Sequence, residues 1–161
     1  MNFKDVDSRY GQITSMKLFN DKLIFWQEHA TGVLSVNERI LINDINDAQL
    51  QLGTGGVLER YDYLSTVYGM KKNQHARANS NGALYWWDGN NKEILQYSQA
   101  IIPLSTTKYI KNYINEGEES ELPTILYNPK YKEVVCNVVN DESVVYSEQV
   151  DAFTSVYDEN V

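Results

Sequence analysis

Short apolar runs separated by turn residues recur along most of the chain. In residues 17–43 the runs lie at 23–26, 33–36 and 40–42, and a Thr-Gly pair separates the first two. Runs of this length, bounded by turn residues, are typical of β-strands. The pattern therefore predicts a first strand meander over residues 17–43.

A second meander is predicted over residues 83–105, around the hairpin sequence ALYWWDGNNKEILQY. Two apolar runs flank its Asp-Gly-Asn-Asn segment at 88–91. Asp and Asn tolerate left-handed backbone angles and Gly adopts them freely, so this segment suits a tight turn. Pro103 lacks a backbone donor, which fits an edge strand or the end of a strand.

The last forty residues predict a third meander, over residues 124–157. Turn residues at 128–130, 140–142 and 148–149 divide it into four short runs rich in Val, Tyr and Phe. Such runs, joined by tight turns, predict four sequential antiparallel strands.

The third meander is apolar on both faces. Successive residues of a strand point to opposite sides, so Val134, Cys136 and Val138 share one face. Val135 and Val139, on the other face, are apolar too. We therefore expect both faces of this sheet to be covered.

A single short amphipathic helix is predicted near residues 106–116. Its apolar positions recur at helical spacing, namely Tyr109, Ile110, Tyr113 and Ile114. Ser105 or Thr106 can cap its N-terminus.

These elements predict an all-β fold with one short helix. Since little helix is available as cover, small two-sided antiparallel sheets are most economically buried against one another, as in the blades of a β-propeller. Propellers have about 4 to 8 blades, so three meanders do not close a ring. We therefore expect residues 1–161 to form a single β-rich domain that is a fragment of a larger propeller or completes its ring with partner chains. A β-sandwich of the same strands is the structural alternative.

Composition narrows the class of partner. The chain has 161 residues, of which 42% are hydrophobic and 22% charged, as expected for one folded domain. Its net charge of −8 argues against nucleic acid or an anionic membrane as partner, because both are negatively charged. No stretch approaches the ~20 apolar residues of a membrane span, so no membrane insertion is expected. The twelve tyrosines suit both strands and protein interfaces.

The sequence offers no motif for catalysis, metal binding or a cofactor. His29 and His75 are its only histidines, and neither has a second histidine at metal-ligand spacing. Spacing alone leaves a nucleophile pair of Cys136 and a histidine open, because such partners need only meet in space. Cys136 nevertheless lies on an apolar strand face, so we expect a buried, inert thiol. The chain is predicted not to be an enzyme and to need neither a metal nor a cofactor.

Four segments resemble the blades of large virion structural proteins of tailed bacteriophages, in particular the tail-tip or muzzle proteins of crAss-like phages. They are YDYLSTVYGM, ALYWWDGNNKEILQYSQAIIPLSTTKYIKNYIN, ILYNPKYKEVVCNVV and VVYSEQVDAFTSVYD, and the resemblance spans residues 53–157. The shared features are a tyrosine-tryptophan strand at 85–88, a Leu-Ser step at 104–105, a hairpin at 127–133 and an aromatic strand at 153–157.

The resemblance implies a non-enzymatic structural module of the phage tail, synthesised in the host cytoplasm and contributing to tail-tip assembly through protein–protein contacts. Its partners would be other virion structural proteins or further blades of a parent chain. Proteins of that kind are much longer than 161 residues, and this chain stops after VYDENV, where a further blade would follow. The resemblance therefore favours a fragment.

A carbohydrate-binding or adhesin module that recognises a host surface glycan is the alternative function. The candidate contact residues are Trp87, Asp88, Asn90 and Asn91, because an aromatic ring stacks on a sugar ring while amides and carboxylates bond its hydroxyls. Trp86 and Trp87 are neighbours on one strand, so their rings point to opposite faces and cannot form one platform. At least one is expected in the core, and which one faces outward is left open.

Overall fold

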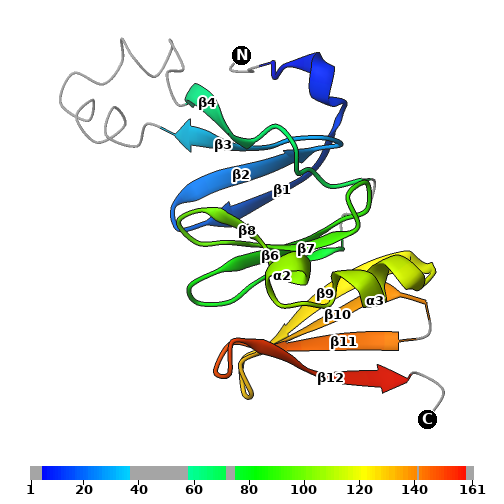
Figure 1. Cartoon of the computed structure of the whole chain (residues 1–161). Helices are drawn as coiled ribbons and strands as arrows, with labels where there is room; N and C mark the ends of the chain where they lie inside the picture. The colour runs from blue at the N-terminus through cyan, green and yellow to red at the C-terminus, as the bar shows by residue number, and fades with distance from the viewer. Residues whose placement is uncertain (1–4, 37–57, 72–74, 141, 159–161) are drawn as a thin grey trace, which may run out of the picture.

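The computed structural model describes residues 5–36, 58–71, 75–140 and 142–158, and most of them lie in β-strands. Within these residues, twelve strands form three four-stranded antiparallel sheets, and helix is limited to short segments. Figure 1 shows the sheets stacked one on another in chain order. The predicted all-β class, built of blade-like meanders, is confirmed.

The first sheet follows a short 3₁₀ turn, η1. Its elements are η1 (Ser8–Tyr10), β1 (Ile13–Phe19), β2 (Lys22–Gln27), β3 (Thr31–Val36) and β4 (Leu58–Ser65), with the strands in sequential order. The sheet starts before the predicted residue 17, and its fourth strand comes from beyond the predicted meander. The apolar run predicted at 40–42 lies outside the described residues.

The middle sheet contains the predicted hairpin. Its strands are β5 (Arg77–Asn79), β6 (Leu84–Asp88), β7 (Glu93–Tyr97) and β8 (Ile101–Pro103). The hairpin register runs from Leu84 opposite Tyr97 to Asp88 opposite Glu93. The left-handed residue of its turn is Lys92, with φ +50°, and not one of the residues 88–91. Pro103 ends the edge strand β8, as predicted.

The last sheet corresponds to the predicted third meander. Its strands are β9 (Glu119–Asn128), β10 (Glu133–Val139), β11 (Glu142–Ser147) and β12 (Ala152–Asp158). Three of the hairpins in the described residues share a four-residue loop whose last residue has φ between +50° and +56°, namely Lys92, Lys132 and Asp151. Loops of this length are usually built on a type I turn, which a left-handed residue can close before the next strand.

The prediction of one continuous helix at 106–116 is wrong. Two short helices are present, α2 (Leu104–Thr107) and α3 (Lys111–Glu116). Tyr109, expected on the buried face, separates them with φ +66° and is 93% exposed. Ser105, expected as a cap, lies inside α2, where its Oγ accepts a hydrogen bond from the Ile94 amide at 2.7 Å. The left-handed residue ends the first helix and turns the chain.

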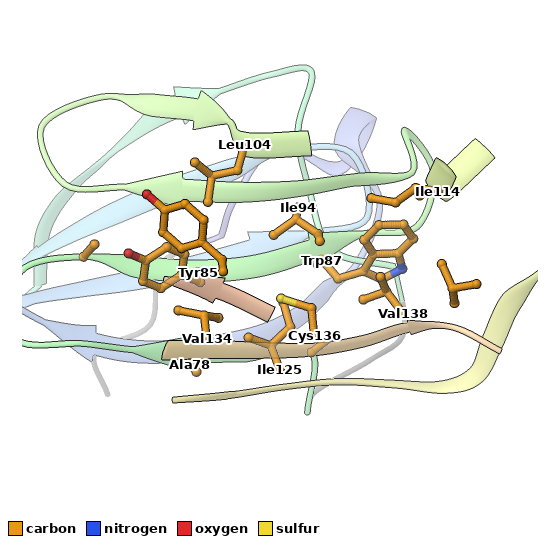
Figure 2. Close-up of a cluster of buried hydrophobic side chains, with 14 residues drawn as sticks. Ala78, Tyr85, Trp87, Ile94, Leu104, Ile114, Ile125, Val134, Cys136 and Val138 are labelled. Carbon is orange, nitrogen blue, oxygen red and sulfur yellow. The ribbon is translucent and has the colours of Figure 1, made fainter. Parts of the chain in front are cut away.

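Two apolar cores hold the three sheets together. The core between the first and middle sheets includes Phe19, Ile24, Trp26, Val33, Met70, Leu84, Trp86, Leu95 and Tyr97. In the core between the middle and last sheets, the labelled side chains of Figure 2 include Tyr85, Trp87 and Ile94 facing Val134, Cys136 and Val138. All five residues of β6 are buried. The middle sheet is therefore covered on both faces, and the predicted apolar face of β10 is confirmed.

Candidate functional site

Trp87, the aromatic residue of the predicted contact site, is buried. Its side chain is 2% exposed and lies in the core between the middle and last sheets. Its indole Nε1 donates to Glu119 Oε1 at 3.1 Å, so the one hydrogen-bond donor of the ring already has a partner within the fold. Trp86 is buried as well, in the other core. At least one tryptophan was expected in the core, and the structure places both there, so neither ring offers a face to a sugar.

Asp88 is fully buried at the start of the hairpin turn. One carboxylate oxygen accepts from the Asn90 amide at 2.9 Å. The other accepts from the Gly69 amide at 3.1 Å and from Asn91 Nδ2 at 2.7 Å. A buried carboxylate is tolerated only when donors of this kind surround it. Asp88 therefore organises the turn and fastens it to the segment that follows β4.

Asn90 and Asn91 have exposed side chains that reach back onto the first sheet. Asn90 Nδ2 donates to the Glu28 carbonyl at 2.8 Å, in the turn between β2 and β3. Asn91 Nδ2 donates to the Val67 carbonyl at 3.0 Å, in the segment after β4. Together with Asp88 these residues form what we call the hairpin latch. Contact of the exposed amides with an outside ligand stays a prediction.

Gly69 is the residue that the hairpin latch contacts in the segment after β4. A Cβ atom there would lie 2.4 Å from the Gln27 carbonyl oxygen and 2.6 Å from that of Glu28. Its own carbonyl accepts from Trp86 Nε1 at 3.2 Å, while its amide donates to Asp88. Only a residue without a side chain allows the chain after β4 to lie so close to the β2–β3 turn.

A second polar cluster joins the middle and last sheets around Glu148. Glu148 Oε2 accepts from Tyr85 Oη at 2.8 Å and from Ser80 Oγ at 2.9 Å. Tyr127 of β9 also hydrogen-bonds Glu148. Burial, and then the hydrogen bond to Glu148, raise the pKa of Tyr85, so its hydroxyl stays protonated and remains a donor.

A hollow of about 330 Å³ lies beside this cluster. It is lined by Ser80, Asn81, Gly82, Tyr127, Lys132, Glu148 and Gln149. Ser80, Tyr85 and Tyr127 already hydrogen-bond the Glu148 carboxylate, so this cluster connects the middle sheet to the last sheet.

The helices are tied to hairpin loops by two lysines. Lys108 pairs with Asp151 at 2.8 Å, and Tyr146 also donates to that carboxylate. The hydrogen bonds of Lys108, and then of Tyr146, lower the pKa of Asp151. Lys111 pairs with the buried Glu93 at 3.1 Å and donates to the Asn91 carbonyl. These contacts hold α2 and α3 against the middle and last sheets.

The outer face of the last sheet carries apolar side chains. Leu126, Val135 and Val145 lie next to one another across three strands, on the face opposite Val134, with Val135 half-buried and Val145 fully buried. Leu126 is 62% exposed, and Tyr157 on the same face of β12 is exposed too. The other positions paired along this face are mostly uncharged, such as Thr124, Asn137, Ser143 and Ser155.

The candidate reactive groups do not assemble into a centre. Cys136 is completely buried, and burial raises the pKa of its thiol to about 12, whereas His29 and His75 are exposed. Across the described part of the chain, no group of three or more His, Cys, Asp or Glu residues is placed to hold a metal ion. Among the same residues, neither short helix has the length and apolar character needed to cross a membrane.

Comparison with known proteins identifies the family of this chain. The model of the family described as Crassvirus muzzle protein matches residues 1–161. The chain belongs to the Crassvirus muzzle protein family. None of the curated proteins matches it. Membership confirms the resemblance found in the sequence and indicates a structural role in a phage virion.

Several residues that join the sheets of this muzzle-family chain carry little signal in the sequence. Local pattern does not predict the roles of Gly69 and Glu148, because their partners lie far away in the chain; Glu148 is 63 positions from Tyr85. The only local signal was the turn position of Glu148. The latch residues were found, but as candidates for ligand contact and not as partners of the first sheet.

Proposed function

We propose that this muzzle-family chain is a non-enzymatic structural module of the phage tail that contributes to tail-tip assembly through protein–protein contacts. The observation that carries the proposal is the apolar outer face of the last sheet. Leu126 and Tyr157 remain exposed there, whereas the equivalent apolar positions on both faces of the middle sheet are covered. Exposed apolar patches on a folded protein mark interaction surfaces.

The polar groups of the chain support the same proposal. The latch and the Glu148 cluster commit their side chains to bonds between sheets, which makes the stack a rigid support. Tyrosine supplies large contact areas with a polar tip, and Tyr109, Tyr131 and Tyr157 are all exposed.

Phage particles that carry an epitope tag on this chain test the proposal. The exposed turn at 98–100, between β7 and β8, accepts an insertion without interrupting a strand. Antibody labelling viewed by electron microscopy should place the tag at the tail tip. Tag absent from purified particles, although the tagged chain is made in infected cells, would end the proposal. Tag found only on the capsid would contradict the tail position.

A further inference from the structure

The first strand of each sheet lies at an edge of that sheet, and these three strands are neighbours in the stack. They are β1, β5 and β9. Arg77 of β5 donates from its Nε to Ser15 Oγ of β1 at 2.6 Å. On the other side, the Ile125 amide of β9 donates to the His75 carbonyl, just before β5, at 3.3 Å. Arg77 therefore lies in the middle of this row of edge strands.

Arg77 borders two hollows along the row. One, of about 340 Å³, is lined by residues 13–16 of β1 and by Arg77. The other, of about 380 Å³, is lined by His75, Arg77 and residues 124–126 of β9. Arg77 lies opposite Trp86 in the β5–β6 ladder, so its side chain is on the face of the middle sheet that packs on the first sheet. The guanidinium is thus placed where the core between these two sheets reaches the surface.

Lys17 brings a second positive charge to the same place. It follows Ser15 by two positions on β1, so the two side chains share a face of the strand, and Lys17 is half-buried. Burial, and then the charge of Arg77, lower the pKa of Lys17. The two cations are therefore close enough to repel each other. Such a pair costs stability unless an anion compensates it.

The fold supplies no such anion within the described residues. There, neither Lys17 nor Arg77 forms an ion pair with an Asp or Glu side chain, and of the Arg77 donors only Nε has a protein acceptor. The cations that do form ion pairs are Arg9, Arg60, Lys108 and Lys111. In a chain with a net charge of −8, two neighbouring cations without a carboxylate partner indicate an anion from outside.

We propose that Arg77 and Lys17 bind a phosphate or sulfate group, as the free ion or carried by a small solute, in the hollow between β1 and β5. Such a group carries up to about two negative charges at neutral pH, which match the two cations. The terminal nitrogens of a guanidinium offer parallel donors to an oxyanion, while Nε stays bonded to Ser15. A long polyanion such as nucleic acid fits less well, because its further phosphates would meet a negatively charged chain.

Titration of the isotope-labelled chain with sodium phosphate, followed by nuclear magnetic resonance, tests the site. Ionic strength is held constant with sodium chloride. The amide signals of Ser15, Lys17 and Arg77 should shift and reach saturation, whereas that of Gly82, in the loop between β5 and β6, should not move with them. Shifts that never saturate, or that spread evenly over the chain, would overturn the proposal.

Two variants remove the charges one at a time. Arg77→Met and Lys17→Met keep an apolar stem, and each should weaken phosphate binding by at least about tenfold, because a hydrogen bond to a charged group is lost. Lys22→Met is the matched control, since Lys22 is an exposed cation at the start of β2. It should bind phosphate as the wild type does. Unchanged binding in the first two variants, or an equal loss in Lys22→Met, would overturn the site.

Thermal melting gives an independent readout. In chloride alone, Lys17→Met should melt at the same temperature as the wild type or higher, because the repulsion by Arg77 is removed. Phosphate stabilises folded proteins in general, so the rise that it causes is compared between proteins. The rise should be larger in the wild type and in Lys22→Met than in Lys17→Met. An equal rise in all three would overturn binding at this place.

Separate titrations with sulfate, inorganic phosphate and a sugar phosphate identify the source of the group. Tighter binding of the sugar phosphate would assign the hollow to an organic solute, and equal affinities would assign it to the free ion; both results support the site. Tighter binding, per phosphate, of a short single-stranded oligonucleotide would overturn the small ligand. The site does not depend on the proposed tail role, which the labelling of virions tests separately.

Discussion

Trp86 and Trp87 are adjacent on β6, and their rings lie in different cores. Trp86 packs edge-on against Trp26 of the first sheet, with ring centroids 5.7 Å apart and an interplanar angle of 62°. Trp87 lies in the opposite core and donates to Glu119, at the start of the last sheet. Because consecutive residues of a strand point to opposite faces, one dipeptide fastens the middle sheet to both of its neighbours.

Replacing either tryptophan should destabilise a different side of the stack. Trp86→Ala and Trp87→Ala should each lower the free energy of unfolding by about 3 to 5 kcal/mol, because each removes a fully buried large side chain. Urea unfolding measures the loss, and hydrogen exchange locates it. Trp86→Ala should speed exchange in β2, and Trp87→Ala should speed it in β10. Faster exchange confined to β10 in Trp86→Ala would contradict the arrangement.

Gly69→Ala should destabilise the protein by at least about 1 to 3 kcal/mol, since the added methyl group meets backbone oxygens of Gln27 and Glu28 that cannot move independently. Gly82→Ala is the matched control, because no atom lies within 4 Å of its added Cβ. It should change stability by less than about 0.5 kcal/mol. Thermal melting of both variants is the measurement. Equal melting temperatures for Gly69→Ala and the wild type would refute the close approach at Gly69.

Asp88→Ala should cost about 2 to 4 kcal/mol, because it leaves buried amide donors of the turn and of Gly69 without their acceptor. Asp62→Ala is a suitable comparison, since that carboxylate forms an exposed pair with Arg60 worth about 0 to 1 kcal/mol. Denaturant unfolding of both proteins gives the difference. A loss no larger in Asp88→Ala than in Asp62→Ala would show that the latch contributes nothing to stability.

The Cys136 thiol should resist a thiol-specific reagent in the folded protein. It is completely buried in the core, and burial raises its pKa to about 12, so both access and thiolate are lacking at neutral pH. Dithionitrobenzoate absorbance should show no labelling of the native chain, and stoichiometric labelling in concentrated guanidinium. Rapid labelling of the native chain would mean that the core between the middle and last sheets opens easily.

Asp151 should make folding stability depend on acid. Its pKa is lowered in the folded state by Lys108 and Tyr146, so its contribution is present above the ordinary aspartate pKa, near ~3.9. The contribution is lost as the pH falls through the lower folded value. Asp151→Asn should flatten the fall of stability below about pH 4. The effect should be small, because the pair with Lys108 is largely exposed on the Asp151 side.

Urea unfolding at a series of pH values measures this dependence. Lys108→Met removes the main cause of the lowered pKa and should flatten the curve in the same way. An unchanged acid slope in both variants would show that Asp151 has no part in it.

The local pattern of apolar and turn residues was sufficient to predict much of the fold. Strand length, turn residues and alternation predicted the middle hairpin and the last meander within a few residues. The apolar alternation of Val134, Cys136 and Val138 also predicted their burial. The helix was predicted as one continuous segment because periodicity alone does not reveal a left-handed residue such as Tyr109, whose backbone breaks the helix in two.

Local sequence is enough to predict that β6 carries two tryptophans on opposite faces and that a tight turn follows it, since period-two alternation and turn chemistry are local properties. The burial of both rings depends on the packing of the three sheets, because alternation says which side of a strand a ring points to and not what covers that side. The same holds for the hairpin latch. Asn90 reaches the Glu28 carbonyl 62 positions away, a contact that exists only once the first sheet is stacked on the middle one.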